Sequence, residues 1–258
     1  VKPVDSAGSK GVTKVEKKES LKAAIEIALE SSISKHFIIE DFLDKVGAQS
    51  SADIFSVEGK LVYPAYSDQL FDKNAANPYT PAIEIWPSSM PQEFQDDLTE
   101  QLQRLITLLG MKTGIYNVES RVCSDGKAYI MEVSPRGGGN RIAELQDMAT
   151  GQKLIKNEIL KALNMPLDHI NAPKYDGVWC NYILHSSRQG ILDSVVIDKS
   201  FRKKYIKDEG LIVAKGDTIH PFTGANTSLG TLFLRAESRK ELDCLLENLE
   251  LYIKLKIV

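Results

Sequence analysis

Two glutamates on successive predicted strands constrain the fold of this chain more than any other feature. Residues 117–133 read as two strands joined by a turn at 124–127, with Glu119 on the first strand and Glu132 on the second. In an antiparallel hairpin, cross-strand residues on one face have Cβ atoms about 5 Å apart. We therefore expect the two carboxylates to share a face, where they repel each other unless one is protonated or a cation lies between them.

The segment after this hairpin has the composition of a phosphoryl-transfer site. Mg²⁺ takes carboxylate oxygens and keeps substrate phosphates among its other ligands. Arg136 lies just beyond Glu132 and suits phosphate or carboxylate recognition. The glycines at 137–139 either form a flexible turn or let the backbone come close to a ligand, and their place after Arg136 favours the ligand. A lone strand glutamate usually points to solvent, but this conjunction is uncommon and favours a functional site.

Composition narrows the remaining classes of protein. The chain has 258 residues, 43% hydrophobic and 26% charged, which is typical of one large globular domain or two small ones. A net charge of −3 with mixed signs predicts no nucleic-acid or membrane partner. Three scattered cysteines, and apolar runs shorter than the roughly 18 residues of a membrane span, predict a cytoplasmic protein. Because the chain starts at Val1, without Met and inside a predicted strand, we expect a fragment that lacks an N-terminal domain.

Hydrophobic periodicity predicts an α+β fold with antiparallel sheets and flanking helices. In the first part of the chain, we expect one helix from an N-cap at Ser20 to about Ser31, and another from Pro91 to Gly110. Residues 68–82 lack periodicity and are predicted to form a mobile loop. The predicted strands in this part are 1–4, 12–15, 37–40, 52–57, 60–66 and 83–86.

A segment rich in Pro and Asn divides the chain into two predicted units. We expect a first domain at 1–165, a linker at 166–176 and a small C-terminal domain at 177–258. Helices at 141–148 and 151–163 end the first domain. The second domain is predicted to contain strands at 178–185, 190–197, 211–215, 230–236 and 254–257 and a helix at 239–252.

A loop of small residues near the N-terminus has the chemistry of an anion site. Small residues let the backbone approach a ligand closely, and consecutive N–H groups form a nest for anions. Lys2 adds positive charge, although a lone strand-end lysine is more often solvated. No helix follows at once and the Gly-Lys-Ser/Thr ending is absent, so this is not a P-loop, and an ordinary hairpin loop is the alternative. The residues assigned to this loop are Ser6, Gly8, Ser9, Lys10 and Gly11.

The stretch Glu40-Asp41-Phe42-Leu43 follows an apolar strand. A hinge at this point offers backbone groups to a flat ring, with Phe42 and Leu43 packing nearby. An ordinary strand end with exposed acids is the alternative, and this stretch taken alone favours that alternative.

Taken in order, these segments resemble the ATP-grasp superfamily. The resemblance covers roughly residues 1–165, from the Lys2-Pro3 strand to the segment Glu132–Arg136. The remainder is similar to the small C-terminal domain of the branch that includes biotin carboxylase, the carbamoyl-phosphate synthase large subunit and carboxylate–amine ligases. That second likeness rests on Lys215-Gly216-Asp217, the strand at Gly230 and a final helix–strand pair.

The resemblance implies a cleft between two α+β lobes that holds ATP. Lys2 and the loop 6–11 would contact the nucleotide and its phosphates, and the hinge 40–43 would hold adenine. Arg136 and Asn140 would form the catalytic loop, with Arg136 stabilising the phosphoryl group or the substrate carboxylate. The family reaction converts a carboxylate to an acyl phosphate, which an amine then attacks. The metal, Mg²⁺ or alternatively Mn²⁺, would be bound by Glu119, Glu132 and Ser134.

The chain departs from the family pattern in three places. Ser134 stands where the family usually has Asn, which weakens the case for a second metal ion. The acidic residue that usually holds the ribose is replaced by Gln49, or lies early at Asp44. The upstream domain, which normally contributes to the substrate and nucleotide sites, is expected to be missing, so the fragment alone is expected to bind ATP poorly.

Three hypotheses for the function follow. The first is an ATP- and Mg²⁺-dependent ligase that joins an amino-acid or peptide-like carboxylate to an amine, as a homodimer acting on small molecules. The second is an enzyme that activates bicarbonate, and the third is an ATP-binding module without catalysis. Specificity is expected to lie in the loops 44–53, 68–82 and 136–141, with Asp53, Asn140 and Arg141 in the pocket.

Overall fold

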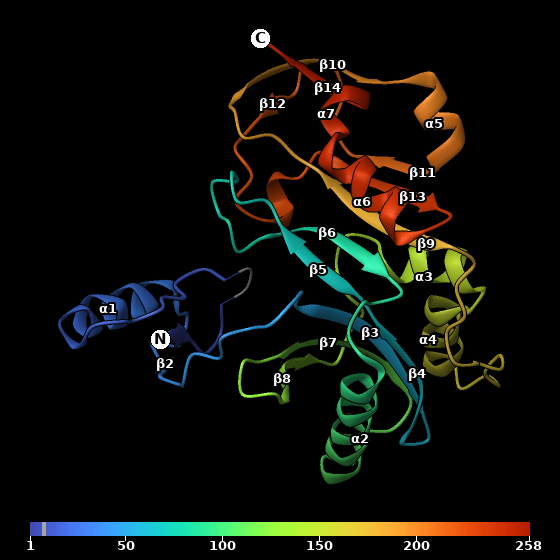
Figure 1. The fold of residues 1–258 in the computed structure, drawn as a ribbon. Helices are drawn as coiled ribbons and strands as arrows, with labels where there is room; N and C mark the ends of the chain where they lie inside the picture. The colour runs from blue at the N-terminus through green and yellow to red at the C-terminus, as the bar shows by residue number, and fades with distance from the viewer. Residues whose placement is uncertain (7–8) are drawn as a thin grey trace.

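The computed structural model describes residues 1–6 and 9–258 (Figure 1). An N-terminal lobe is built on two short antiparallel strands in which Lys2 lies opposite Ile38. A helix contacts both strands from one side. The elements of this lobe are β1 (Lys2–Pro3), the 3₁₀ turn η1 (Lys18–Ser20), α1 (Leu21–Ser31) and β2 (Phe37–Ile38).

Two predictions for this lobe are wrong. Residues 12–15 do not form a strand, because Val1 and Thr13 exchange two backbone hydrogen bonds of 2.9 Å and the pairing goes no further. Ser20 precedes α1 without capping it, since its own backbone is already helical and its side chain accepts no hydrogen bond from the first turn.

A four-stranded antiparallel sheet in the order β4-β3-β7-β8 forms the floor of the candidate site. Successive side chains along a strand point to opposite faces. The apolar residues Ala52, Ile54 and Val118 therefore share one face, which packs on α2 (Gln92–Leu108). The other face is polar around Asp53, Asn117 and Glu119. It is apolar where Phe55, Tyr63 and Ile115 pack on α3 (Ile142–Thr150) and α4 (Leu154–Ala162). The strands of this sheet are β3 (Ser50–Val57), β4 (Lys60–Tyr66), β7 (Gly114–Val122) and β8 (Ala128–Ser134).

The second large sheet has the order β11-β13-β9-β6-β5 and draws strands from both sides of the predicted linker. The division into domains at 1–165 and 177–258 stays a prediction. The mobile loop predicted at 68–82 is wrong: it contains β5 and the start of β6, and buried polar residues such as Asp68 and Gln69 hide the strand pattern. The strands are β5 (Asp68–Phe71), β6 (Pro81–Trp86), β9 (Val178–Leu184), β11 (Ile206–Leu211) and β13 (Gly230–Ala236).

The remaining elements surround these sheets. The strand predicted at 211–215 lies earlier, at β11, because the chain turns at Gly216, whose φ is +97°. The single helix predicted at 239–252 is interrupted at Asn248. The further elements are α3 (Ile142–Thr150), α4 (Leu154–Ala162), β10 (Gly190–Ile197), α5 (Lys199–Tyr205), β12 (Thr218–Ile219), η2 (Ala225–Thr227), α6 (Arg239–Glu247), α7 (Leu249–Tyr252) and β14 (Ile253–Ile257).

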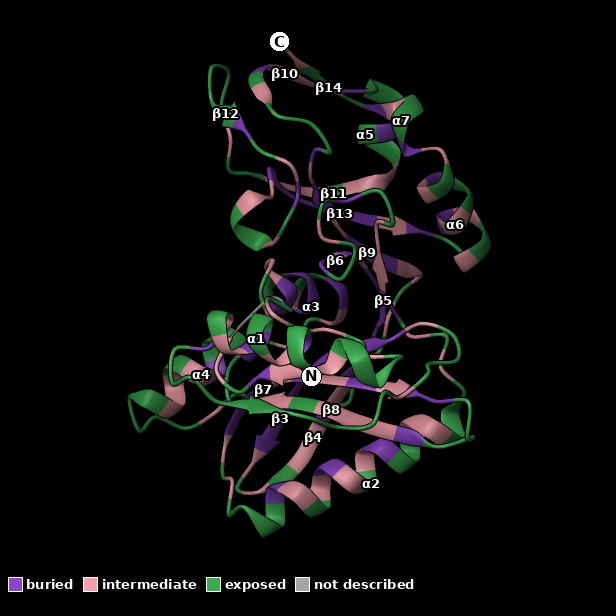
Figure 2. Ribbon diagram, turned by 90° about the vertical axis from the view of Figure 1, so that its left-hand side faces the viewer, coloured by how far each residue is buried: buried purple, intermediate pink, exposed green. Residues whose placement is uncertain are grey.

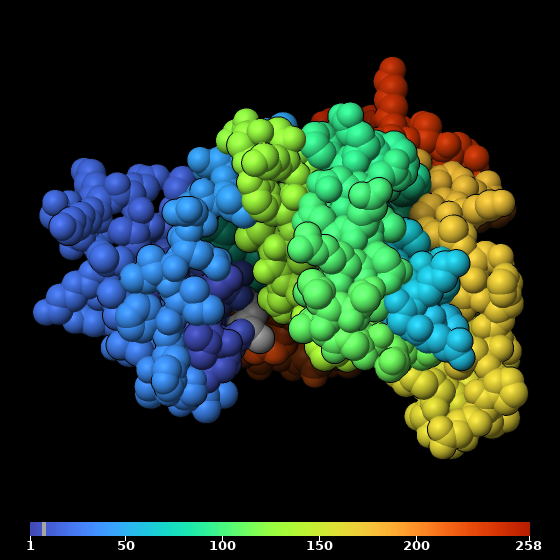
Figure 3. All heavy atoms as spheres, turned by 90° about the horizontal axis from the view of Figure 1, so that it is seen from below, coloured from blue at the N-terminus to red at the C-terminus, as the bar shows by residue number. Residues whose placement is uncertain are grey.

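Buried residues concentrate in the two large sheets and beneath α2 and α6 (Figure 2). Viewed from below, the N-terminal lobe stands to one side of α2 and of the β7–β8 hairpin (Figure 3). Over the described ranges, none of the helices combines the length and apolarity that crossing a membrane requires. The fold thus places the N-terminal lobe beside the β7–β8 edge of the four-stranded sheet.

Candidate active site

The hairpin places the two glutamates directly opposite each other. Glu119 pairs with Glu132 in the β7–β8 register, and Asn117 pairs with Ser134 one step further on the same face. Ser134 Oγ donates a hydrogen bond of 2.8 Å to Glu132 Oε1. Glu132 is exposed, whereas Glu119 is half-buried. Burial raises the pKa of Glu119, and the negative charge of Glu132 raises it further. A divalent cation bound between the two carboxylates relieves the repulsion between them.

The donor set fits a hard cation that brings its own oxygen ligands. Among residues 1–6 and 9–258, no group of three or more His, Cys, Asp or Glu side chains is arranged to hold a metal ion. Glu119, Glu132 and the hydroxyl of Ser134 therefore leave coordination positions for water or phosphate oxygens. Mg²⁺ in nucleotide sites is bound in this way, by one or two carboxylates and the substrate phosphates.

Gln49 lies beneath the glutamate pair and not at an exposed ribose position. Its side-chain amide donates to Glu119 Oε2 at 3.2 Å and to Gln69 Oε1 at 3.0 Å. Arg121 donates to Gln49 Oε1 at 2.5 Å and to the carbonyl of Leu43 at 3.1 Å. Arg121 thus connects the hinge to the glutamates. Sequence reasoning missed this residue, and its one signal is its position two residues after Glu119.

The small N-terminal sheet brings Lys2, the predicted nucleotide ligand, to the hinge predicted at 40–43. Lys2 Nζ lies 2.6 Å from Glu40 Oε1, and both side chains are partly exposed. Phe42 is exposed, and Lys14 Nζ lies 4.3 Å from the centre of its ring and 3.6 Å from Asp44. Sequence reasoning missed Lys14, whose only signal is a positive charge shortly after the small-residue loop. Asp41 is also exposed.

The small-residue loop is described at Ser6 and from Ser9 onward, so Gly8 lies outside the described residues. Ser9 and Lys10 are exposed. Gly11 has a φ of +76°, and a Cβ there would lie 2.5 Å from Ser31 Cβ, so a glycine is needed for packing on α1. Asp5 anchors this end of the lobe, because its carboxylate accepts hydrogen bonds from Ser32 Oγ and from the N–H groups of residues 33 and 34.

The glycines after Arg136 come close to the protein itself. The N–H of Gly138 donates to Asp53 Oδ1 at 2.8 Å, and a Cβ at Gly138 would lie 2.8 Å from Asn117 Nδ2. The interpretation that these glycines approach a ligand is therefore corrected at Gly138. Asp53 is fully buried rather than open to a pocket, and burial raises its pKa to about 6. The guanidinium of Arg136 is exposed at the start of this loop.

The far end of the loop is fixed to the five-stranded sheet. The carbonyl of Asn140 accepts a hydrogen bond of 2.7 Å from Asn181 Nδ2. Arg141 forms ion pairs of 2.7 Å with both Glu144 and Asp208, and its guanidinium stacks 4.6 Å from the ring centre of Phe233. The charge of Arg141 is thus neutralised by the protein.

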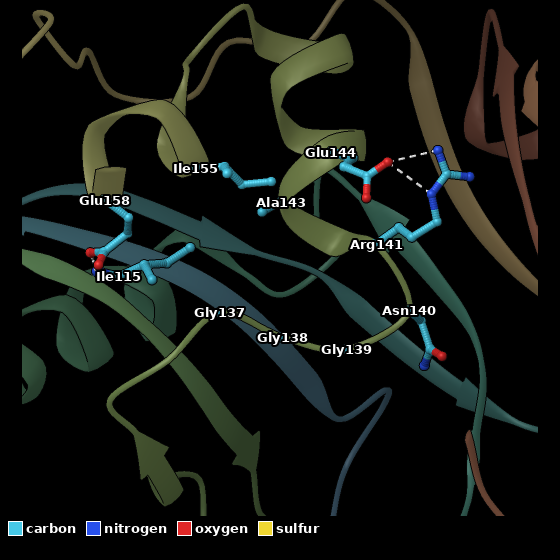
Figure 4. Close-up of a pocket in the computed structure, with 10 residues that line it drawn as sticks. All are labelled: Ile115, Gly137, Gly138, Gly139, Asn140, Arg141, Ala143, Glu144, Ile155 and Glu158. Atoms are coloured by element: carbon cyan, nitrogen blue, oxygen red, sulfur yellow. Dashed lines mark hydrogen bonds and ion pairs between the residues drawn. The ribbon is translucent and has the colours of Figure 1, made fainter. Parts of the chain in front are cut away.

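A pocket of about 380 Å³ lies between this loop and helices α3 and α4 (Figure 4). Ile115 on β7 shares the sheet face of Asn117 and Glu119, so the pocket lies on the same face of the sheet as the glutamate pair. Its size falls within the range of small-molecule sites. The lining residues are Ile115, Gly137, Gly138, Gly139, Asn140, Arg141, Ala143, Glu144, Ile155 and Glu158.

Comparison with known proteins gives concordant matches. Residues 1–144 match the family described as the ATP-grasp domain. A D-alanine–D-alanine ligase from Parabacteroides distasonis is 29% identical over 144 residues, which are 54% of this chain and 42% of that protein. An L-amino acid ligase from Bacillus licheniformis superposes with a TM-score of 0.77 at 17% identity, over 100% of this chain and 62% of that one. A biotin carboxylase from Campylobacter jejuni gives a TM-score of 0.74 at 14% identity, over 98% and 56%.

The chain belongs to the ATP-grasp family, because the family match covers more than half of it. Its α+β fold with antiparallel sheets is the fold of the solved ATP-grasp enzymes. The family consists of ATP-dependent ligases that act on small molecules and use ATP with a divalent metal. The chain spans less than half of the D-alanine–D-alanine ligase and under two thirds of each solved structure.

Proposed function

We propose that this chain forms the ATP- and Mg²⁺-binding part of a ligase that joins a carboxylate to an amine and releases ADP and phosphate. The observation that carries this proposal is the direct pairing of Glu119 with Glu132 on a polar sheet face, with the exposed Arg136 just beyond it. Phosphoryl transfer needs little from a protein besides positioning and charge neutralisation, and this arrangement supplies both.

Each predicted residue has a role in this reaction. Glu119, Glu132 and Ser134 would hold Mg²⁺, which would supply charge neutralisation for the phosphates of ATP. Lys2 leaves Glu40 to contact the nucleotide, the loop 6–11 covers the phosphates, and the hinge 40–43 lies against adenine. Gln49 has no free side-chain group for the ribose, so it acts by orienting Glu119.

The chemical steps divide between two bonds. A carboxylate oxygen of the substrate attacks the γ-phosphorus, the bond to ADP breaks, and an acyl phosphate forms. The amine nitrogen then attacks the carbonyl carbon, phosphate leaves with the oxygen that it shared with the acid, and the nitrogen loses a proton. Arg136 stabilises the negative charge of the transferring phosphoryl group, and Asn140 helps to position the acceptor.

The substrates are proposed to be amino acids or peptide-like acids. Matched proteins are a D-alanine–D-alanine ligase and an L-amino acid ligase. The pocket beside the loop has an apolar wall of Ile115, Ala143 and Ile155, which suits an aliphatic body. We further propose a cytoplasmic homodimer, and the free cysteines at 123, 180 and 244 fit a reducing compartment.

Isotope transfer tests the reaction on the longer protein that contains this chain. We expect ADP release with Mg²⁺-ATP only when an acid and an amine are both present, and transfer of ¹⁸O from the labelled carboxylate to inorganic phosphate. ADP release driven by bicarbonate alone would establish the bicarbonate-activating alternative. Binding of Mg²⁺-ATP without turnover over a broad panel of acids and amines would establish a module without catalysis.

A further inference from the structure

Glu84 and Asn181 form a buried polar pair at the centre of the five-stranded sheet. They lie directly opposite each other in the β6–β9 register, so their Cβ atoms are about 5 Å apart on one face. Glu84 is 2% exposed and Asn181 is fully buried. Neither residue has a place in the metal site or in the nucleotide lobe.

The hydrogen bonds of this pair leave two acceptors without a donor. Gln69 Nε2 donates to Glu84 Oε1 at 3.4 Å, and Oε2 of the same carboxyl has no partner. Asn181 Nδ2 donates to the carbonyl of Asn140, while Asn181 Oδ1 has no partner. Rotating the Asn181 amide does not help, because its oxygen would then face the carbonyl oxygen of Asn140. A buried acceptor without a donor is costly, and here two such acceptors belong to cross-strand neighbours.

Asp68 in the same sheet shows how this protein surrounds a buried carboxyl group with hydrogen-bond donors and a cation. Asp68 is also 2% exposed. Its two oxygens accept hydrogen bonds from Ser88 and Ser89, and Arg239 forms an ion pair with it at 2.6 Å. Among the described residues, no Lys, Arg or His forms an ion pair with Glu84. Glu84 has the amide of Gln69 and the hydroxyl of Ser51 nearby, but it lacks the cation that stabilises Asp68.

We propose that Glu84 carries a proton in the folded protein, that its O–H donates to Asn181 Oδ1, and that Asn181 thereby holds the Asn140 end of the loop 136–141. One proton satisfies both orphaned acceptors. Burial, opposed by the nearby amide of Gln69 and hydroxyl of Ser51, raises the pKa of Glu84 to about 8. The charged groups that face Glu84 are the carboxylates of Asp53 on β3 and Glu119 on β7, and both disfavour its ionisation.

Glu84 is on this account a positioning residue that acts on the loop through Asn181. The importance of the loop for catalysis rests on the proposed function, but the protonated state of Glu84 does not. The first test therefore needs no nucleotide and no substrate. It compares infrared difference spectra of the wild-type chain and of Glu84→Gln at neutral pH.

We expect a carbonyl stretching band of a protonated carboxylic acid in the wild type that is missing in Glu84→Gln. Asp53→Asn serves as the control that assigns a second band, because Asp53 is another fully buried carboxyl with a raised pKa. If both chains give the same spectrum in this region, Glu84 is ionised and the proposal is overturned.

Stability gives an independent reading. Gln keeps the shape of Glu84, and its NH₂ donates to Asn181 Oδ1 without any proton, so Glu84→Gln should melt within a degree or two of the wild type or above it. Glu84→Leu should melt clearly lower, since it removes that donor. Glu250→Gln, at an exposed glutamate, is the matched control and should change nothing. Equal destabilisation by Gln and Leu at position 84 would contradict a neutral hydrogen-bond donor there.

The action on the loop has its own readout in the complete enzyme. Asn181→Leu removes the donor to the Asn140 carbonyl, so we expect kcat to fall about tenfold or more while the affinity for Mg²⁺-ATP stays unchanged. Unaltered kcat would overturn the positioning role, even if the infrared band shows the proton. If the complete enzyme has no turnover at all, the proposed function fails while the infrared and melting results still stand.

Discussion

The N-terminal lobe and the four-stranded sheet border the same proposed ATP site, but different forces hold them. The buried apolar side chains of α1 are only Ala24 and Ala28, and Phe37 and Ile38 on β2 are exposed. Counted over the described ranges, none of the five buried apolar clusters takes a residue from 1–48. The sheet instead packs fully buried side chains on α2. The lobe depends on polar contacts, and the sheet depends on apolar burial.

This difference predicts that the two halves of the proposed site differ in mobility. A region with little buried apolar area opens at a low free-energy cost, whereas a packed sheet opens only on global unfolding. We therefore expect the nucleotide half of the site to move and the metal half to stay fixed. Glu119 and Glu132 lie on the fixed half, and Lys2 with its hinge partner Glu40 lies on the mobile half.

The largest expected effect comes from the fixed half. Glu132→Gln removes one metal-binding charge from an exposed strand position, so the fold should persist. A metal ion stabilises the charge of the transferring phosphoryl group by several kcal/mol, so turnover in the complete enzyme should fall about 100-fold or more. Steady-state ADP release with increasing Mg²⁺ measures this.

Glu93→Gln, at an exposed glutamate in the first turn of α2, is the matched control and should keep normal turnover. If Glu132→Gln retains full activity, the metal assignment is wrong. If Glu132→Gln instead unfolds the chain, the stability of the sheet depends on Glu132 as well as on apolar burial.

The second prediction concerns stability and contrasts the two regions directly. Leu98 is fully buried between α2 and the sheet, so Leu98→Ala should lower the free energy of unfolding by about 2–5 kcal/mol. Ile27 on α1 is 46% exposed, so Ile27→Ala should change it by no more than about 0.5 kcal/mol. Urea unfolding of both variants measures the difference. Similar losses would mean that the lobe has a core comparable to that of the sheet.

The third prediction uses pH to test the interior of the five-stranded sheet. Glu84 has a folded pKa of about 8 against an ordinary value of 4.5, so the folded chain binds an extra proton between these values. Its stabilising contribution is full below pH 4.5 and is lost as the pH rises toward 8. The free energy of unfolding of the wild type should therefore fall relative to Glu84→Gln by a few kcal/mol over this range.

Denaturant unfolding of the two chains in parallel isolates Glu84, because all other titrating groups are shared. Asp53, whose pKa is also raised, shifts both curves in the same direction. A difference that stays constant with pH would show that Glu84 titrates alike in the folded and unfolded chain. The interior of this sheet would then tolerate the charge of an ionised Glu84.

The alternation of polar and apolar residues was enough to predict the hairpin that carries the two glutamates. The alternation around 117–133 and the turn at Asp125-Gly126 specify one hairpin, and the structure pairs Glu119 with Glu132 as that pattern predicts. The strand predicted at 230–236 has the bounds of β13 for the same reason. The stop of α2 before Gly110 follows from the positive φ that glycine tolerates.

Polar residues with distant partners were beyond sequence reasoning. Asp68 looks like a loop residue, but Arg239, 171 positions away, makes its burial in β5 affordable. Arg141 looks like a substrate ligand, but Asp208 neutralises it. Asn181 carries no sequence signal, and its bond to the loop depends on a register between distant strands. In each case the partner determines the role, and spacing along the chain does not reveal the partner.

The smallest expected effect on global stability, and the sharpest test of the lobe, comes from Asp5. Its carboxylate accepts hydrogen bonds from Ser32 Oγ at 2.7 Å and from the N–H of Ser34 at 2.7 Å, and these hold its pKa well below the ordinary value. Asp5→Asn should therefore speed amide hydrogen exchange across residues 1–48 and weaken nucleotide binding, while the main unfolding transition stays in place.

Asp125→Asn is the matched control for this experiment. Asp125 is likewise an aspartate with a lowered pKa, held by Tyr129 and the N–H of Lys127, but it is exposed and lies on the β7–β8 turn. It should leave exchange in the lobe and nucleotide affinity unchanged. Adding Mg²⁺-ATP should slow exchange in the wild-type lobe more than in the sheet, because the ligand stabilises most the region that becomes ordered when it binds. If Asp5→Asn shifts the main transition as much as Leu98→Ala does, the lobe and the sheet unfold as one unit. The lobe would then not be more mobile than the sheet.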